Sequence, residues 1–317
     1  MATRIGICRS LHTFNHYPLW RAFLSELGFD VVLSEPVNRE TLDFGARVAP
    51  AEVCLPVKAF IGQIARIADA VDALFIPRLV CRRVNRRLFF GCPKAIALPD
   101  VVRAIFPRLG GIIELIIDER ERPEWQAFRD LAVSLGVSRW RPAWLSACHA
   151  AEEALGVTRA SGSPLHVFGE EVSPLPTVRG PRTAVVGHSY LLFDRHLGMN
   201  VLKHVSDAGA QVVVAFPSAK ELSRHESLLV SPPSWYYELE LLTATGLSVE
   251  TGAIDGLLFV SSFACGTAPV TYEMIRRKLV RGKFPMLTLL LDEQTGEAGQ
   301  RTRIESFVDL LMLKGKR

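Results

Sequence analysis

Three of the six cysteines stand in similar local settings that suit metal or cluster binding. Cys54, in "AEVCLPVKAF", has a proline two residues later, and Cys92, in "FFGCPKAIALPD", is followed directly by one. Cys265, in "FVSSFACGTAP", ends an apolar run and precedes a glycine. Thiolates favour zinc or an iron–sulfur cluster over hard cations, but the spacing matches no zinc finger or ribbon. Each thiol alone could also be a small buried apolar side chain, so both interpretations remain open.

The neighbours of these cysteines favour the interpretation as metal or cluster ligands. Pro56 fits the first turn of a helix that would begin beside Cys54, because its missing N–H has no partner to lose there. The positive end of that helix and Lys58 would both stabilise a thiolate. Gly266 would let the backbone approach a bulky inorganic group closely. We therefore expect Lys58 and Gly266 to contribute to the binding of such a group.

Two further side chains could take part in chemistry at the end of another predicted strand. His188 and Tyr190, in "GHSYLLFD", follow an apolar run, with Asp194 nearby. A histidine in this position could transfer protons beside a cluster, or it could cap a loop. The residues leave these two interpretations open.

Two charged groups have a functional and a structural interpretation. The charged residues between Asp292 and Glu305 could bind a partner or substrate, although an ion-pair network that holds the last helix is favoured. Thr302 and Glu305 are spaced as a capping box for that helix. The arginines in "CRRVNRRLFF", residues 81–90, could bind the phosphates of coenzyme A or an acidic surface. The alternative for these arginines is a solvated loop.

The elements that must position these residues alternate between strand and helix. In the first half, strands are predicted over 4–8, 29–34, 72–79 and 111–118, with helices over 17–28, 59–71 and 99–109. The pattern restarts after a helical stretch over 123–157 and a segment rich in Ser, Pro and Gly over 160–182. We predict an α/β fold with two doubly wound, Rossmann-like parallel-sheet domains and a helical connecting segment. Residues 1–165 would carry Cys54 and Cys92, and residues 166–317 would carry Cys265.

Composition narrows the class of protein. The 317 residues are 49% hydrophobic with a formal net charge of +4, which predicts a globular protein without the broad basic face of a nucleic-acid binder. No signal peptide or long apolar span is evident, so a cytoplasmic protein that does not enter a membrane is expected. Reduced cysteines are expected in that compartment.

Several segments together resemble a known family. In order, these are "GICRSLHTFNHYPLWRAFLSELGFDVVLSE", "EVCLPVK", "FIPRLV", "CPKAIALPD", "VVGHSYLLFD", "DGLLFVSSFACGTAP" and "LLLDEQTGEAGQRTRIESFVDLL". They are similar to activase-related proteins allied to 2-hydroxyacyl-CoA dehydratase subunits and double-cubane cluster proteins. The resemblance implies that Cys54, Cys92 and Cys265 hold an iron–sulfur cluster, either a 4Fe-4S cubane or part of a double cubane.

The resemblance also implies a function in anaerobic metabolism. The chain would be the cluster-binding subunit of an ATP-coupled low-potential reductase or 2-hydroxyacyl-CoA dehydratase-type system, a lyase or an oxidoreductase component. It would form a homodimer or heterodimer, receive electrons from a separate ATP-hydrolysing activator, and act on an acyl-CoA or another small molecule. The alternatives are a non-catalytic cluster carrier and the activase itself, although no glycine-rich phosphate-binding loop is present.

The remaining cysteines are assigned differently. Cys8 stands where the family usually has a proline, and it could be an extra ligand or a simple substitution. Cys81 and Cys148 are interpreted as structural.

Overall fold

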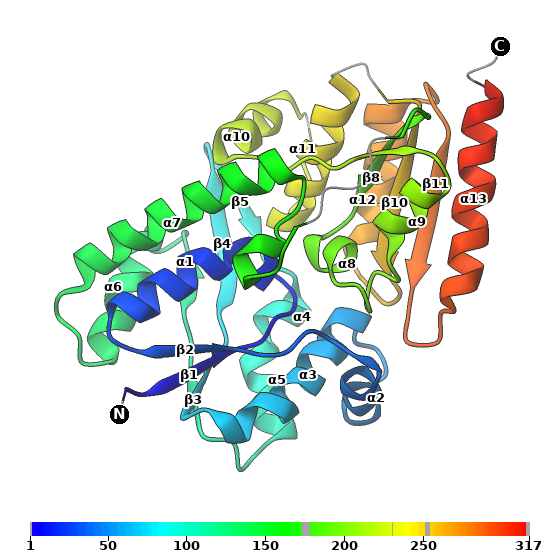
Figure 1. The fold of residues 1–317 in the computed structure, drawn as a ribbon. Helices are drawn as coiled ribbons and strands as arrows, with labels where there is room; N and C mark the ends of the chain where they lie inside the picture. Colours follow the sequence, from blue (N-terminus) through cyan, green and yellow to red (C-terminus); the bar gives the residue numbers. More distant parts are fainter. Residues whose placement is uncertain (1, 173–177, 230, 251–253, 315–317) are drawn as a thin grey trace. The chain divides into compact units, whose positions relative to one another are not determined.

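The computed structural model describes residues 2–172, 178–229, 231–250 and 254–314, and it divides into two compact units (Figure 1). Unit 1 comprises residues 1–53, 57–157 and 234–236, and unit 2 comprises residues 54–56, 158–233 and 237–317. The chain therefore passes between the units several times. Part of the stretch rich in Ser, Pro and Gly, residues 173–177, lies outside the described residues.

Unit 1 contains the first parallel sheet that the sequence predicts. Its strands β1 (Arg4–Ile7), β2 (Asp30–Leu33), β3 (Ala73–Phe75) and β6 (Gly111–Ile113) lie in the order β2-β1-β3-β6. The pairs β1–β2, β1–β3 and β3–β6 are all parallel. Strand β1, one of the two central strands, is buried over three of its four residues, as is typical of an apolar central strand of a parallel sheet.

A second, smaller sheet in unit 1 was not expected. Strands β4 (Arg78–Val84) and β5 (Arg87–Phe90) form an antiparallel hairpin, and β7 (Ile116–Asp118) pairs with β4 in parallel. The predicted strand over 111–118 is thus two strands in different sheets. The interpretation of the arginine-rich residues as a solvated loop was wrong, because a turn at Asn85, with φ of 53°, folds them into this hairpin.

The helices of unit 1 surround these sheets. Aromatic side chains join them to the core: Trp20 lies 5.5 Å from Phe75 and Phe23 lies 4.8 Å from Phe128, measured between ring centroids. The helical elements that begin in residues 1–157 are α1 (Thr13–Glu26), α2 (Arg39–Val48), α3 (Leu55–Ile67), η1 (Ala68–Ala70), α4 (Pro93–Ile96), α5 (Leu98–Ile105), α6 (Glu124–Ser134) and α7 (Trp140–Ser161).

Two glycines let α2 and α3 approach each other closely. A Cβ atom at Gly45 would lie 1.8 Å from the carbonyl oxygen of Lys58, and one at Gly62 would lie 1.9 Å from that of Thr41. Neither position tolerates a side chain without movement of the backbone. These contacts fix the path of α3, the helix that begins directly after Cys54.

Unit 2 contains the second predicted parallel sheet. Its strands are β8 (Arg182–Val186), β9 (Gln211–Val213), β10 (Gly256–Ser262) and β11 (Met286–Leu291), in the order β11-β10-β8-β9. All three strand pairs are parallel. In chain order this arrangement repeats that of unit 1: the second strand lies on one side of the first, and the third and fourth lie on the other side.

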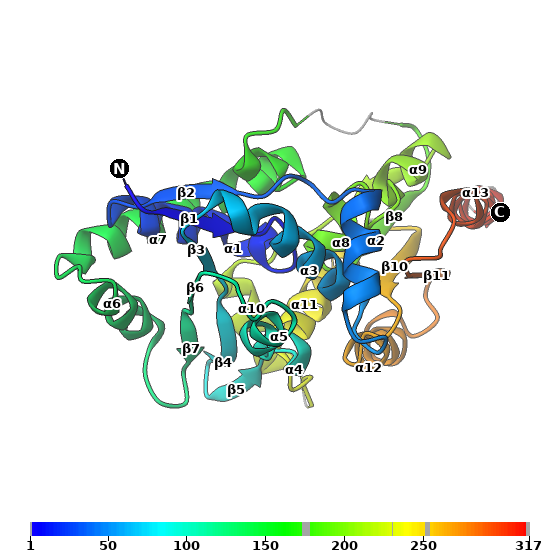
Figure 2. The ribbon, with the colours of Figure 1, turned by 90° about the horizontal axis from the view of Figure 1, so that it is seen from below.

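Helices cover both faces of the unit 2 sheet, and Figure 2 shows α12 on one side and α9 on the other. Leu241 and Leu242 of α11 and Ala268 of α12 pack with Phe259 and other buried strand residues. The helical elements that begin after residue 164 are η2 (Leu165–Phe168), α8 (Ser189–Phe193), α9 (Val201–Asp207), α10 (Ala219–Leu228), α11 (Tyr236–Glu250), α12 (Ala268–Met274), the π-helix η3 (Ile275–Val280) and α13 (Glu297–Lys314). The predicted α/β class with Rossmann-like parallel sheets is therefore confirmed.

The predicted capping box at Thr302 was wrong. The last helix, α13, begins at Glu297, so Thr302 lies inside it, and its hydroxyl donates to the carbonyl of Ala298 at 3.2 Å. The apolar stripe of this helix was right, because Ile304, Phe307, Val308 and Leu311 are all buried. A real capping box occurs at Ser218 and Glu221 of α10.

None of the helices in the described ranges has both the length and the apolar character that a bilayer span requires.

Candidate functional site at the strand ends of unit 2

The carboxyl ends of β8 and β10 mark the point in unit 2 where the strand order reverses. In open α/β sheets, ligands bind at this topological switch point. His188 follows β8 and is the N-cap residue of α8, and Cys265 follows β10. Both side chains were predicted from the sequence as site residues, and both belong to this edge of the unit 2 sheet.

A buried carboxylate, Glu238 of α11, connects the two strand ends. Its side chain is 2% exposed, and it lies 3.4 Å from the Nε2 atom of His188. The hydroxyl of Thr267 donates to one carboxylate oxygen, and the hydroxyl of Thr271 donates to the other at 2.6 Å. Glu238 thus holds the start of α12 and the end of β8 at the same point.

The electrostatics of Glu238 follow from these contacts. Burial by itself would raise the pKa of this carboxyl. The hydrogen bond and charge of His188, with the hydroxyls of Thr267 and Thr271, outweigh burial and hold the pKa below its ordinary value. Glu238 is therefore a buried anion that the protein stabilises in its charged form.

Cys265 lies at the edge of this network. Its Sγ atom is 3.6 Å from the Oγ1 atom of Thr267. Because Thr267 already donates its only hydroxyl proton to Glu238, it can accept from the thiol but cannot donate to it at the same time. The side chain of Cys265 is therefore linked to Glu238 and His188 through the hydroxyl of Thr267.

His188 has a defined orientation in this site. Its ring stacks on Tyr190 at a centroid distance of 5.1 Å, and its side chain is 11% exposed. It makes no side-chain capping hydrogen bond to α8; its backbone carbonyl accepts from Leu191 instead. The contact of the imidazole with Glu238 fits both interpretations left open by the sequence, so proton transfer by His188 remains a prediction.

The loop that carries Cys265 is constrained. Ala264 has a positive φ of 60°, which is unfavourable for a residue with a side chain, and the amide of Cys265 donates to the carbonyl of Ser262 at 3.2 Å. A Cβ atom on Gly266 would meet no heavy atom within 4 Å. Space is therefore open beside Gly266, and its predicted role toward a bulky group remains a prediction.

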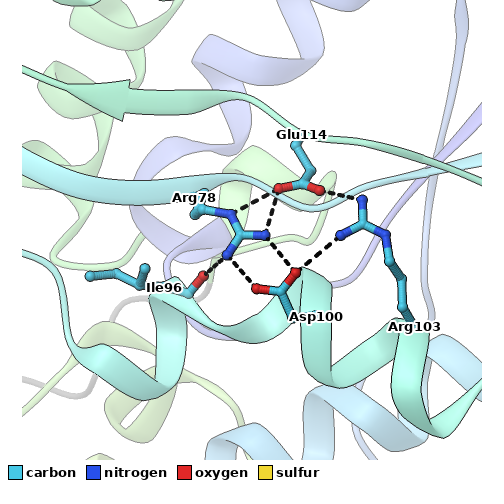
Figure 3. A network of polar contacts seen from close by, with 5 residues as sticks. All are labelled: Arg78, Ile96, Asp100, Arg103 and Glu114. Atoms are coloured by element: carbon cyan, nitrogen blue, oxygen red, sulfur yellow. Dashed lines mark hydrogen bonds and ion pairs between the residues drawn. The ribbon is translucent and has the colours of Figure 1, made fainter. Parts of the chain in front are cut away.

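In unit 1, Cys92 is the residue that precedes α4, with a proline at the start of that helix. The carbonyl of Ile96, at the other end of α4, accepts from Arg78 at 2.8 Å. Arg78 is 16% exposed and also binds Asp100 at 2.7 Å and Glu114 at 2.8 Å, as Figure 3 shows. Arg103 completes the network from α5. These contacts attach α4 to strand β4 and so fix the position of Cys92.

The segments around Cys92 and Cys54 are joined by a hydrogen bond. Lys94, two residues after Cys92, donates from Nζ to the carbonyl of Glu52 at 2.7 Å. Cys54 is buried and directly precedes α3, and Lys58 is buried one turn further along that helix. Glu52 and Lys94, which are far apart in the sequence, therefore meet within unit 1.

The other cysteines have environments that disfavour a thiolate. Cys8 and Cys81 are buried, and burial raises the pKa of both thiols, with a further contribution from Asp118 at Cys81. The pKa of Cys148 is also raised, first by burial and then by Glu124 and Glu152. These environments support the structural interpretation of Cys81 and Cys148.

In the described part of the chain, no three His, Cys, Asp or Glu side chains form a group that could hold a metal ion. Cys92 belongs to unit 1, whereas Cys54 and Cys265 belong to unit 2. The three sulfur atoms are thus not brought together within one unit.

The arginines of the β4–β5 hairpin also have structural partners. Arg82 pairs with Glu124 at 2.5 Å and lies 5.5 Å from the ring of Tyr236, and the backbone of Arg83 donates to Glu119 at 2.6 Å. Arg82 therefore holds the hairpin against its neighbours and is not available as a free phosphate ligand.

Sequence reasoning missed Glu238, which lies between two predicted elements. The available signal was a pair of acidic residues, Glu238 and Glu240, inside the otherwise apolar run "YYELELLTATGL". A carboxylate that faces a core must have partners, and these partners come from β8 and α12.

The fold and these sites define a protein of two Rossmann-like α/β units with cysteines and a buried acid at strand ends. The family described as CoA enzyme activase uncharacterised domain matches residues 4–215, and the chain belongs to this family. A search of curated proteins found no match.

Proposed function

We propose that this chain is the iron–sulfur cluster-binding component of an ATP-coupled low-potential reductase or 2-hydroxyacyl-CoA dehydratase-type system. Cys54, Cys92 and Cys265 would be the ligands. A separate activator ATPase would supply electrons, and a dimer or heterodimer would shield the cluster. The membership of the activase family supports the wider assignment to CoA-linked activation chemistry.

The observation that carries this proposal is the hydrogen bond from Lys94 to Glu52, because it brings the Cys54 and Cys92 segments together. All three proposed ligands also share one local arrangement. Cys54 and Cys92 directly precede α3 and α4, and Cys265 lies three residues before α12; each of these helices has a proline in its first turn. Such positions leave a thiol near backbone N–H groups that favour its ionised form.

The donor set fits an iron–sulfur cluster in its chemistry. Thiolates are the usual protein ligands of such clusters, and three of them would leave one iron of a 4Fe-4S cluster for another ligand. With Cys265 as a ligand, His188 and Glu238 would lie close enough to the cluster to exchange a proton there.

The proposal is tested by anaerobic purification with iron and sulfide analysis and low-temperature EPR. Cys54→Ser, Cys92→Ser and Cys265→Ser are each expected to lose most of the bound iron, because no spare thiolate replaces the missing ligand. Cys148→Ser, a half-buried cysteine on α7, is the matched control and should keep it. Full iron content in all three ligand variants, or an iron-free wild type after reconstitution, would refute the assignment.

A second function, the activase itself, is favoured by the description of the family. It requires ATP hydrolysis by the pure chain. Measuring phosphate release from ATP, with and without bound iron, separates the two functions. Hydrolysis by an iron-free monomer would favour the activase, and iron-loaded protein without hydrolysis would favour the cluster-binding component.

A further inference from the structure

Strand β9 lies at an edge of the unit 2 sheet, and one side of its backbone has no partner strand. In the order β11-β10-β8-β9 it pairs only with β8, in parallel. The amide of Gln211 donates to the carbonyl of Pro181 at 3.0 Å, so the backbone of Gln211 faces β8. Because successive residues of a strand direct their backbone groups to opposite sides, Val212 directs its N–H and C=O away from β8. These two groups form no hydrogen bond within the described residues.

The open part of this edge continues to Val214. This residue directly follows β9, and its backbone also has no hydrogen-bond partner in the described ranges. Two residues further along, the carbonyl of Phe216 accepts from Nε of Arg159 at 2.8 Å, which closes the edge there. The unpaired N–H and C=O groups of an edge strand are a template for pairing with another strand. Val212 and Val214 therefore offer a short segment of open edge.

This open edge lines a large cavity of unit 2. The cavity has a volume of about 1190 Å³, and both Val212 and Val214 belong to its lining. Ligand sites in proteins commonly measure about 300–1,000 Å³, so the space can hold a short extended segment of polypeptide. Part of its wall is apolar and comes from α8 and α9, with Leu192, Phe193 and Leu202 all buried. An added strand would thus find backbone partners at β9 and apolar contacts at α8 and α9.

The charges of the lining are balanced. Lys203 pairs with Asp207 at 2.5 Å, and Arg301 pairs with Glu305 at 2.8 Å. In the part of the chain that the structure describes, two arginines of the lining pair with no acid and two of its acids pair with no lysine or arginine: Arg182, Arg195, Glu171 and Glu297. Glu297 contacts His204 instead, at 2.8 Å. This balance favours neither a cation nor an anion and suits a ligand that carries both signs of charge, as a polypeptide segment does.

We propose that this cavity binds an extended segment of a partner protein, which adds a strand to the unit 2 sheet beside β9. The backbone of the segment would bond to Val212 and Val214, and its apolar side chains would lie against α8 and α9. Its acidic and basic side chains would pair with the arginines and acids of the lining. In strand addition, main-chain hydrogen bonds give affinity and side-chain pockets give specificity. The site goes beyond the proposed function and includes none of the cysteines, so it is tested on the metal-free full chain.

The test is binding of short fluorescent peptides, measured by fluorescence anisotropy. In these peptides valine alternates with polar residues, which are lysine and glutamate in one peptide, lysine alone in the second and glutamate alone in the third. The peptide with both signs is expected to bind about twofold to fivefold more tightly than the others, because it pairs with both kinds of charge. No binding of any of the three at millimolar concentration would overturn the site. Equal affinities, or a preference for one sign, would overturn the assignment of the charges.

Methylation of the peptide backbone shows whether the peptide binds as a strand. N-methyl groups are placed on the valines in one version and on the polar residues in another. Since successive residues direct their N–H groups to opposite sides, only one version loses its hydrogen bonds to β9. That version is expected to bind at least about fivefold more weakly, and the other should stay near the parent affinity. Equal affinity of the two versions would overturn strand addition.

A proline substitution locates the site on β9. Val212→Pro removes the outward N–H but leaves the ladder to β8, because proline is tolerated on the open side of an edge strand. Peptide binding is expected to weaken by about threefold or more. Leu290→Pro is the matched control on β11, the other edge strand of this sheet. Its neighbour Leu291 faces β10 through the amide of Phe263, so Leu290 faces outward and its replacement should leave peptide binding unchanged.

A second variant keeps the test valid if Val212→Pro does not fold, which circular dichroism checks. Arg195→Glu changes an exposed side chain of the lining. It is expected to weaken binding of the glutamate peptide and to strengthen binding of the lysine peptide, each by about twofold to fivefold. Unchanged affinities in a folded Arg195→Glu and a folded Val212→Pro would overturn the proposal.

Light scattering after size exclusion, with and without the peptide, identifies a second copy of the chain as the occupant. The peptide is expected to leave the oligomeric state unchanged. An oligomer that the peptide dissociates would assign the cavity to a second copy and overturn a different partner. None of these variants changes a proposed cluster ligand. A failure here with retained iron binding would therefore leave the proposed function intact, so the two failures are distinguishable.

Discussion

Replacement of Glu238 by alanine is expected to destabilise unit 2 strongly. The change removes a carboxylate that is 2% exposed and leaves His188, Thr267 and Thr271 without their shared acceptor. Breaking a buried ion pair on one side typically costs about 3–5 kcal/mol in the free energy of unfolding. Glu238→Gln keeps the volume and one acceptor oxygen but loses the charge, so we expect a loss of about 1–3 kcal/mol.

The dependence on pH gives this prediction a second readout. The pKa of Glu238 is lower in the folded protein than in the unfolded chain, so its charge stabilises the fold above the unfolded pKa of about 4.3. This contribution is lost as the pH falls through the lower, folded-state pKa. The difference in stability between the wild type and Glu238→Gln should therefore be constant near neutral pH and shrink in acid.

Urea unfolding followed by far-ultraviolet circular dichroism measures both effects. Glu273→Ala is the matched control, because Glu273 is an acid on the same helix as Thr271 but forms its ion pairs at the exposed surface. It should leave the unfolding midpoint nearly unchanged. A Glu238→Ala protein as stable as the wild type, or a difference that grows in acid, would refute the reasoning.

Two further predictions concern unit 1, which contains all five tryptophans, so that fluorescence in urea reports on it. Arg78→Ala should lower the free energy of unfolding by about 2–4 kcal/mol, because Glu114 and the carbonyl of Ile96 lose a nearly buried donor; a loss no larger than that of the more exposed Arg103→Ala would contradict it. Gly45→Ala should cost about 1–3 kcal/mol or more because the new Cβ atom meets the backbone of α3, whereas Gly156→Ala on α7, where nothing lies within 4 Å, should be neutral or stabilising.

The parallel sheets could be predicted because their strands are short apolar runs between clear helices. The positions of His188 and Cys265 at strand ends followed from the same pattern. The site that they form did not, because it depends on Glu238, whose partners are far away in the sequence. No periodic pattern identifies which buried acid faces which hydroxyl.

Local signals also failed where two elements competed for one stretch. Thr302 and Glu305 have the spacing of a capping box, but the chain was already helical from Glu297, so the threonine bonds within the helix. The hairpin of β4 and β5 was not predicted, because the arginines on both sides of Asn85 indicated a solvated loop and the alternating apolar residues of the two strands gave a weaker signal. The hairpin also pairs with the distant strand β7, and such a contact is not visible in a window of sequence.

The three residues Ser234–Tyr236 have a consequence for the order of folding. They belong to unit 1 although most of the chain around them belongs to unit 2, and the carbonyl of Ser234 accepts from the amide of Phe90 at 2.7 Å while Trp235 forms a parallel bridge to Phe90. During synthesis, the edge of β5 therefore has to wait for this segment until more than two thirds of the chain has left the ribosome. Since unpaired strand edges favour aggregation, a nascent chain stopped before residue 234 should be less soluble than the full chain.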